Sequence, residues 1–83
     1  MPYATFDGVE IIKVLRKHGF RIVDRTGSHV KLRYTDPNTG ETRNVTVPEK
    51  RADRISQDTY RSIADQCGAE DFAAWCQWIE SAR

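Results

Sequence analysis

The residues whose types and spacing could do chemistry lie near the middle of the chain. A short polar pair, Gly27 and Ser28, precedes a histidine, His29, and an alternating run that carries Lys31 and Arg33. Because side chains of a strand alternate between its two faces, His29, Lys31 and Arg33 are expected on one face and the apolar residues between them on the other. An imidazole can accept or donate a proton near neutral pH, and the two cations can neutralise phosphate charge. The pattern predicts a site that handles a phosphodiester.

The residues before the histidine support the same interpretation. Gly27 can adopt a positive φ and leaves space for a ligand close to the backbone. Ser28 offers a hydroxyl and a backbone N–H to a phosphate oxygen, and Arg25 adds a cation nearby. The tripeptide of glycine, serine and histidine is common in proteins, so it does not define a catalytic site without its context.

Other candidate sites are weaker. His18 is expected at the end of a helix, where it can bind the last carbonyl groups. The two histidines and the scattered carboxylates have no metal-ligand spacing, and no glycine-rich phosphate loop occurs, so we predict neither a metal nor a cofactor. Ser28 and His29 are adjacent without a third partner, and they do not predict a nucleophile–base pair.

Length and composition predict one globular domain. The chain has 83 residues, of which 39% are hydrophobic and 30% charged. It contains no apolar run of the roughly 18 residues that cross a membrane, and its first four residues predict no signal peptide. Cys67 and Cys76 match no disulfide or metal motif, so we expect two reduced thiols in a cytoplasmic protein.

The net charge of +1 conceals an uneven distribution. Residues 1–61 carry twelve Lys or Arg against eight Asp or Glu, whereas residues 62–83 carry one against four. From residue 16 to residue 33, six cations accompany a single acid, Asp24. Such a cationic field favours a polyanionic partner, although a solvated surface with scattered charges would have the same composition.

Helix and strand signals place the candidate site in a small sheet. A capping box of Asp7 and Glu10 and a terminating Gly19 predict a first helix over residues 7–18. Strands are expected over residues 20–25, 30–35 and 41–47, with Phe20 and Ile22 facing the helix and Arg25 on the opposite side. Turns at residues 26–28 and 36–40 make the sheet an antiparallel meander.

Two further helices are expected after the sheet. One begins at Ser56 or Asp58 and ends near Cys67, and a short final helix begins near residue 70 and carries Trp75. The order predicts an α+β fold, α-β-β-β-α, with helices on one face of a three-stranded antiparallel sheet. We place the core in residues 6–68 of this single domain and treat residues 69–83 as a helical extension that could support a homo-oligomer.

Several segments resemble, in order, the HicA-type toxins of HicA/HicB toxin–antitoxin systems. They are the helix end Leu15–Phe20, the stretch Arg25–His29 with its alternating strand, Val45–Pro48, Thr59–Ile63 and Gln66–Gly68. The resemblance implies a fold like that of double-stranded-RNA-binding domains, an RNA-cleaving toxin or mRNA interferase, and a HicB-like antitoxin that covers the active surface. The active-site histidine of the family falls on His29. Many members carry a second histidine after the third strand, where Glu49 and Lys50 stand here.

Together, the residues and the resemblance predict a metal-independent endoribonuclease with His29 as general base. Gly27, Ser28, Lys31, Arg33 and Arg25 are the expected RNA-binding residues. One alternative is a domain of the same fold that binds RNA without cutting it. Another is a toxin that acts mainly as a corepressor or assembly partner through its final helix.

Overall fold

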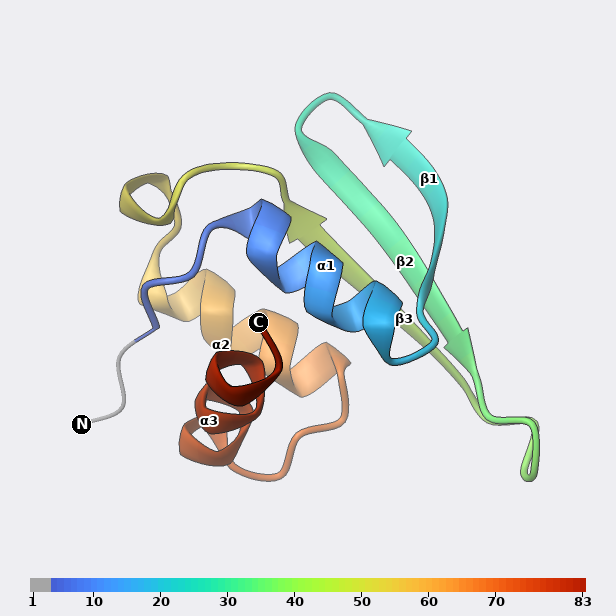
Figure 1. Ribbon diagram of the computed structural model, residues 1–83. Helices are drawn as coiled ribbons and strands as arrows, with labels where there is room; N and C mark the ends of the chain where they lie inside the picture. Colours follow the sequence, from blue (N-terminus) through green and yellow to red (C-terminus); the bar gives the residue numbers. More distant parts are fainter. Residues whose placement is uncertain (1–3) are drawn as a thin grey trace.

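The computed structural model describes residues 4–83, and residues 1–3, which belong to the segment predicted to hold no signal peptide, lie outside the described residues. The elements in chain order are α1 (Gly8–Lys17), β1 (Arg21–Thr26), β2 (His29–Thr35), β3 (Thr42–Pro48), the short 3-10 helix η1 (Ala52–Arg54), α2 (Gln57–Gln66) and α3 (Phe72–Ala82) (Figure 1). This is the α+β order α-β-β-β-α with a C-terminal helix, so the predicted fold class is confirmed. None of the described helices is long and apolar enough to cross a membrane.

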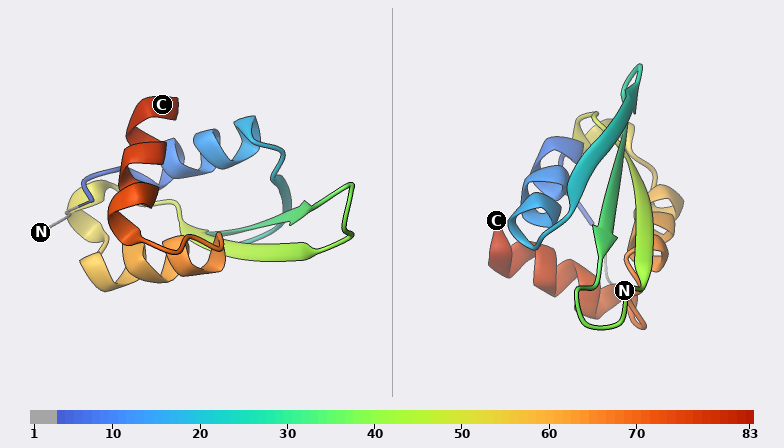
Figure 2. Two further views of the ribbon diagram at one scale, coloured as in Figure 1. Left: turned by 90° about the horizontal axis from the view of Figure 1, so that it is seen from below. Right: turned by 90° about the vertical axis from the view of Figure 1, so that its right-hand side faces the viewer.

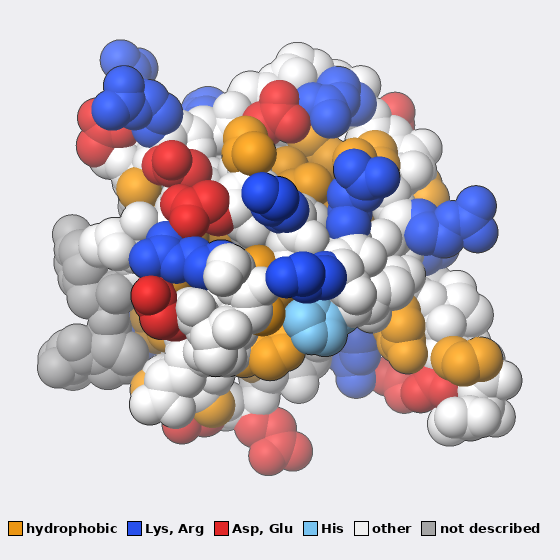
Figure 3. Space-filling model, viewed as in Figure 1, with side chains coloured by type: hydrophobic (Ala, Val, Ile, Leu, Met, Phe, Trp, Pro, Cys, Tyr) orange, Lys and Arg blue, Asp and Glu red, His pale blue; other side chains and the backbone are white. Residues whose placement is uncertain are grey.

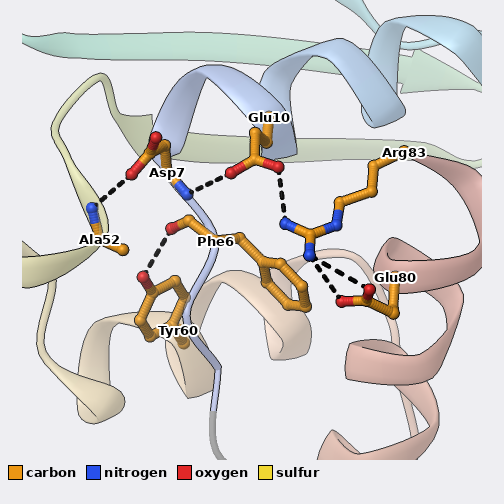
Figure 4. Close-up of polar contacts among 7 residues, drawn as sticks. All are labelled: Phe6, Asp7, Glu10, Ala52, Tyr60, Glu80 and Arg83. Atoms are coloured by element: carbon orange, nitrogen blue, oxygen red, sulfur yellow. Dashed lines mark hydrogen bonds and ion pairs between the residues drawn. The ribbon is translucent and has the colours of Figure 1, made fainter.

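The first helix begins and ends at the residues that its sequence signals predict. The Asp7 amide donates to the Glu10 carboxylate at 3.1 Å, which completes the capping box. The Asp7 carboxylate also accepts the Ala52 amide at 2.7 Å, and therefore ties the start of α1 to η1 (Figure 4). Gly19 has a φ of 97°, a left-handed conformation that favours glycine, and reverses the chain into β1.

The three strands form an antiparallel sheet in the order β1-β2-β3. Val30 and Leu32 of β2 and Val45 and Val47 of β3 are completely buried beneath the helices. Helices α1 and α2 lie on one face of the sheet, and no helix of the described chain covers the other face (Figure 2). The sheet therefore buries one side and presents the other to solvent.

The predicted alternation of β1 was wrong in its second half. Phe20 is buried as expected, and Ile22 lies opposite the buried Leu32 on the expected side, although at the edge of the sheet it is 38% exposed. The register between β1 and β2 shifts between Ile22 and Asp24, so a bulge exchanges the two faces of the strand beyond this point. Arg25 consequently pairs with the buried Val30 rather than with a residue of the open face.

The hydrophobic core continues into α3. Trp75 and Ile79 have only 3% and 0% of their surface exposed, and Trp75 packs edge-on against Phe6 at 6.2 Å between ring centres. At its end, α3 is held to α1 by Arg83, whose guanidinium lies 2.7 Å from the Glu10 carboxylate (Figure 4). The segment from residue 69 onward thus contributes buried surface to the domain, beyond the core expected in residues 6–68.

Candidate active site

The central strand presents the predicted alternation. His29, Lys31 and Arg33 are exposed, whereas Val30 and Leu32 between them are completely buried. Because β2 pairs on both sides, with β1 and with β3, its backbone cannot slip by one residue without exposing its apolar side chains. The sheet therefore fixes the imidazole and the two cations on the helix-free face.

A two-residue turn leads into the histidine. Gly27 has a φ of 58°, while Ser28 has a negative φ, the combination typical of a type II′ hairpin turn. A Cβ atom added at Gly27 would meet no atom within 4 Å, so the backbone conformation and not the space favours glycine here. Thr26 and His29 close the turn as directly opposed residues.

The turn is also tied to the third strand. His29 lies opposite Pro48, and the Glu49 amide donates a hydrogen bond to the Ser28 carbonyl. Gly8, at the start of α1, donates its amide to the Lys50 carbonyl at 2.8 Å. The backbone around the histidine is therefore held by the first helix and by both neighbouring strands.

A cavity of about 290 Å³ lies on the open face around the histidine. Its lining residues are Asp24, Thr26, His29, Lys31 and Thr46. His29 and Lys31 form its centre, with Asp24 and Thr26 on the β1 side and Thr46 on the β3 side, as the register requires. The arrangement combines a proton acceptor, an ammonium group and two hydroxyls in one small space.

Three of these lining residues were missed in the sequence. Thr46 could have been found, because Val45 and Val47 were expected in the core and the residue between them must face the other way. Asp24 and Thr26 could not be found by alternation, because the bulge in β1 reverses their faces.

The two predicted arginines lie outside the cavity. Arg33 donates from Nε to the Asn44 side-chain oxygen at 2.9 Å, and it is four residues, or about 13 Å at the usual rise of a strand, from His29. Arg25 lies on the side of the sheet that carries Val30 and forms an ion pair with Glu49 at 2.8 Å. The structure thus brings together His29 and Lys31 but separates Arg33 and Arg25 from them.

Basic side chains also gather outside the cavity, on the first helix and the edge strand. Figure 3 shows Lys and Arg side chains gathered over α1 and β1 on the face that it presents. Exposed cations on these elements include Lys13, Arg16, Lys17 and Arg21. This distribution agrees with the uneven charge of the sequence and favours the approach of a polyanion.

The remaining histidine has a structural contact. His18 Nδ1 lies 2.9 Å from the Val14 carbonyl oxygen at the end of α1, as its position predicts. Its ring also packs on Trp78 of α3, with ring centres 4.7 Å apart. Within residues 4–83, no group of three His, Cys, Asp or Glu side chains could hold a metal ion.

The fold is that of a small α+β domain, and its open sheet face presents His29 and Lys31 to solvent. The family model described as HicA toxin of bacterial toxin–antitoxin systems matches residues 8–69. The chain belongs to this family and is therefore a toxin of a toxin–antitoxin system, with a cognate antitoxin as its partner. Members of the family generally cleave mRNA. Neither the search of curated proteins nor the search of solved structures found a match.

Proposed function

We propose that this toxin is a metal-independent endoribonuclease that cleaves mRNA in the cytoplasm with His29 as general base. The observation that supports this proposal is the cavity on the helix-free face, in which His29 and Lys31 lie side by side. Because β2 is paired on both sides, the His29 side chain stays on the open face, where a general base can reach a bound RNA.

In the proposed reaction, His29 takes the proton of a ribose 2′-hydroxyl, and the 2′ oxygen attacks the adjacent phosphorus. The bond from phosphorus to the 5′ oxygen breaks, and the leaving oxygen takes a proton from water. The products are a 2′,3′-cyclic phosphate and a 5′-hydroxyl. No metal ion is needed, because the imidazole supplies the base and Lys31 stabilises the charge that develops on the phosphate.

The other predicted contacts hold the RNA strand along the sheet. Gly27 and Ser28 let the backbone come close to the turn, and the Thr46 hydroxyl donates to a phosphate oxygen from the β3 side. Arg33 lies about 13 Å along β2 from His29 and binds another phosphate of the same RNA. Arg25, on the opposite side of the sheet and paired with Glu49, takes no direct part in this contact. We further propose that the antitoxin neutralises the toxin by covering this face.

The test is cleavage of a long single-stranded RNA in EDTA by the wild type, His29→Ala and His29→Gln. Loss of a positioned general base reduces the rate by about 10²–10⁴-fold. Both variants are therefore expected to cleave the RNA more slowly than the wild type by this factor. His18→Gln is the matched control, because it removes the other histidine, which lies outside the cavity. The wild type is expected to leave 2′,3′-cyclic phosphate ends.

Two results would contradict the proposal. Products with 3′-hydroxyl ends would exclude attack by the 2′-hydroxyl. Equal RNA affinity of the wild type and His29→Gln, with no cleavage by either, would make the domain an RNA-binding module. Circular dichroism of His29→Ala checks the fold, which the loss of an exposed side chain is expected to leave intact.

A further inference from the structure

The cavity around His29 contains a carboxylate, Asp24, which the binding of a phosphate does not require. The bulge in β1 puts Asp24 on the same face as His29 and directly opposite Lys31. Asp24 is exposed, and its Oδ1 accepts the Arg25 amide at 2.9 Å, which fixes the side chain close to its own strand. No ion pair of the described residues involves this carboxylate, although Asp24 lines the cavity.

A negative charge at this position opposes the binding of phosphate, because like charges repel at short range. The carboxylate therefore does not serve the phosphodiester itself. The groups of RNA that can donate to it are the 2′-hydroxyl and the amino and imino groups of the bases. In the proposed reaction the reacting 2′-hydroxyl lies at His29. The partner left for Asp24 is therefore the nucleobase.

The layout of the cavity agrees with this assignment. Its β3 side carries the Thr46 hydroxyl, its centre carries His29 and Lys31, and its β1 side carries the only acid. Asp24 is diagonal to His29 across the two strands, a relationship that separates Cα atoms by about 7–8 Å. A nucleotide with its phosphate between Lys31 and Thr46 would direct its base toward β1 and Asp24.

We propose that Asp24 selects the base of the nucleotide whose 2′-hydroxyl reacts, and that it favours guanine. The imino and amino groups on one edge of guanine donate in parallel to a carboxylate, and Oδ1 keeps a second lone pair beside the one that accepts the Arg25 amide. Uracil instead offers one donor between two acceptors. This inference rests on the proposed function, because it assigns the substrate of the same site. Discrimination by a two-bond contact to a base edge is worth about 5–150-fold.

The test uses four RNAs in which every nucleotide except one carries a 2′-O-methyl group. The single reactive nucleotide is guanosine, adenosine, cytidine or uridine, and kcat/KM is measured for each. The wild type is expected to cleave at guanosine about 5–150-fold faster than at uridine. Asp24→Asn replaces one acceptor by a donor, and we expect it to reduce this ratio to within about twofold, since the paired acceptors are lost.

Asp65→Asn is the matched control. Asp65 is an exposed carboxylate on α2 that lies outside the cavity, and its loss changes the net charge equally. This control is expected to keep the guanosine-to-uridine ratio of the wild type. Asp24→Ser, which retains an acceptor for the Arg25 amide, repeats the test if Asp24→Asn fails to fold.

Two outcomes would overturn the assignment. Equal rates at all four nucleotides in the wild type would exclude base selection. An equal rise in all four rates in Asp24→Asn would make Asp24 a repulsive charge only. If the wild type cleaves none of the RNAs, the proposed function fails, and fluorescence anisotropy with the same RNAs decides the inference separately: a guanosine preference lost in Asp24→Asn supports it, and equal affinities overturn it.

Discussion

The guanidinium of Arg25 lies 2.8 Å from the carboxylate of Glu49, which joins β1 to the segment after β3. The Glu49 amide also donates to the Ser28 carbonyl, so one residue holds both the strand before the turn and the turn itself. Glu49 and Lys50 stand where the resemblance to the family implies a second histidine. In this chain, the position supports the backbone that carries His29.

The Arg25–Glu49 ion pair is expected to contribute little free energy of unfolding. Both side chains are partly exposed, at 48% and 35%, and exposed pairs are typically worth about 0.2–1 kcal/mol. A double-mutant cycle with Arg25→Ala and Glu49→Ala, measured by urea denaturation, is expected to give a coupling energy in this range. A coupling well above it would mean that the pair is part of a larger network.

The positions of the cations predict unequal effects on RNA binding. Lys31 lies in the cavity beside His29, whereas Arg25 lies on the other side of the sheet and is paired. Lys31→Ala is expected to reduce the slope of log affinity against log salt by about 0.7, the value for one phosphate contact with a single strand. Arg25→Ala is expected to change the slope much less. Equal slopes for the two variants would contradict this distinction.

Gly8 is required by close packing at the start of α1. A Cβ atom here would overlap the carbonyl oxygen of Pro48, the residue opposite His29. Gly8→Ala is therefore expected to lower the free energy of unfolding by about 1–3 kcal/mol, the usual cost of overpacking. Val9→Ala is the matched control, because the Val9 side chain is 57% exposed and its loss should change stability by less than about 0.5 kcal/mol. Urea denaturation of both variants compares them directly.

Local sequence patterns predicted the central strand but not its neighbour. In β2, buried Val30 and Leu32 alternate with exposed residues, and only one register satisfies both faces. In β1, every residue is exposed, so no burial pattern records the bulge that puts Asp24 beside Lys31. Bulges depend on pairing with a partner strand, and the sequence of one strand does not contain that information.

The thiol of Cys67 is expected to be unreactive in the folded protein. Burial raises the pKa of Cys67 to about 11, while the Trp75 indole and the charge of Arg43 act in the opposite direction. In the folded state the thiol keeps its proton to a higher pH than in the unfolded state, where it ionises near its ordinary pKa of 9.0. The contribution of this group to stability is thus present below pH 9 and is lost as the pH rises toward 11.

Alkylation with iodoacetamide at pH 8 checks the thiol prediction. Cys76 is the internal comparison, since burial also raises its pKa but it is much less enclosed. Mass spectrometry is expected to find Cys76 modified before Cys67 in the native protein, and both modified at similar rates in urea. Faster native modification of Cys67 would mean that α3 opens readily from α2.

The last helix is expected to be necessary for the fold. Trp75 and Ile79 are almost completely buried, and replacing a buried tryptophan by alanine typically costs about 3–5 kcal/mol. Small domains have a free energy of unfolding of only about 5–15 kcal/mol. Trp75→Ala is therefore expected to lower the urea midpoint strongly, whereas Trp78→Ala, at a partly buried position of the same helix, should lower it less.

Truncation after Gly68 decides between a structural α3 and a separate assembly element. If α3 served only for assembly, the truncated chain would keep its fold and any RNA cleavage. Because Trp75 closes the core against Phe6, and Arg83 pairs with Glu10 of α1, we expect the truncated chain to lose native circular dichroism and cleavage together. A folded, active fragment of residues 1–68 would instead mean that the family segment is stable alone and that α3 is an accessory helix.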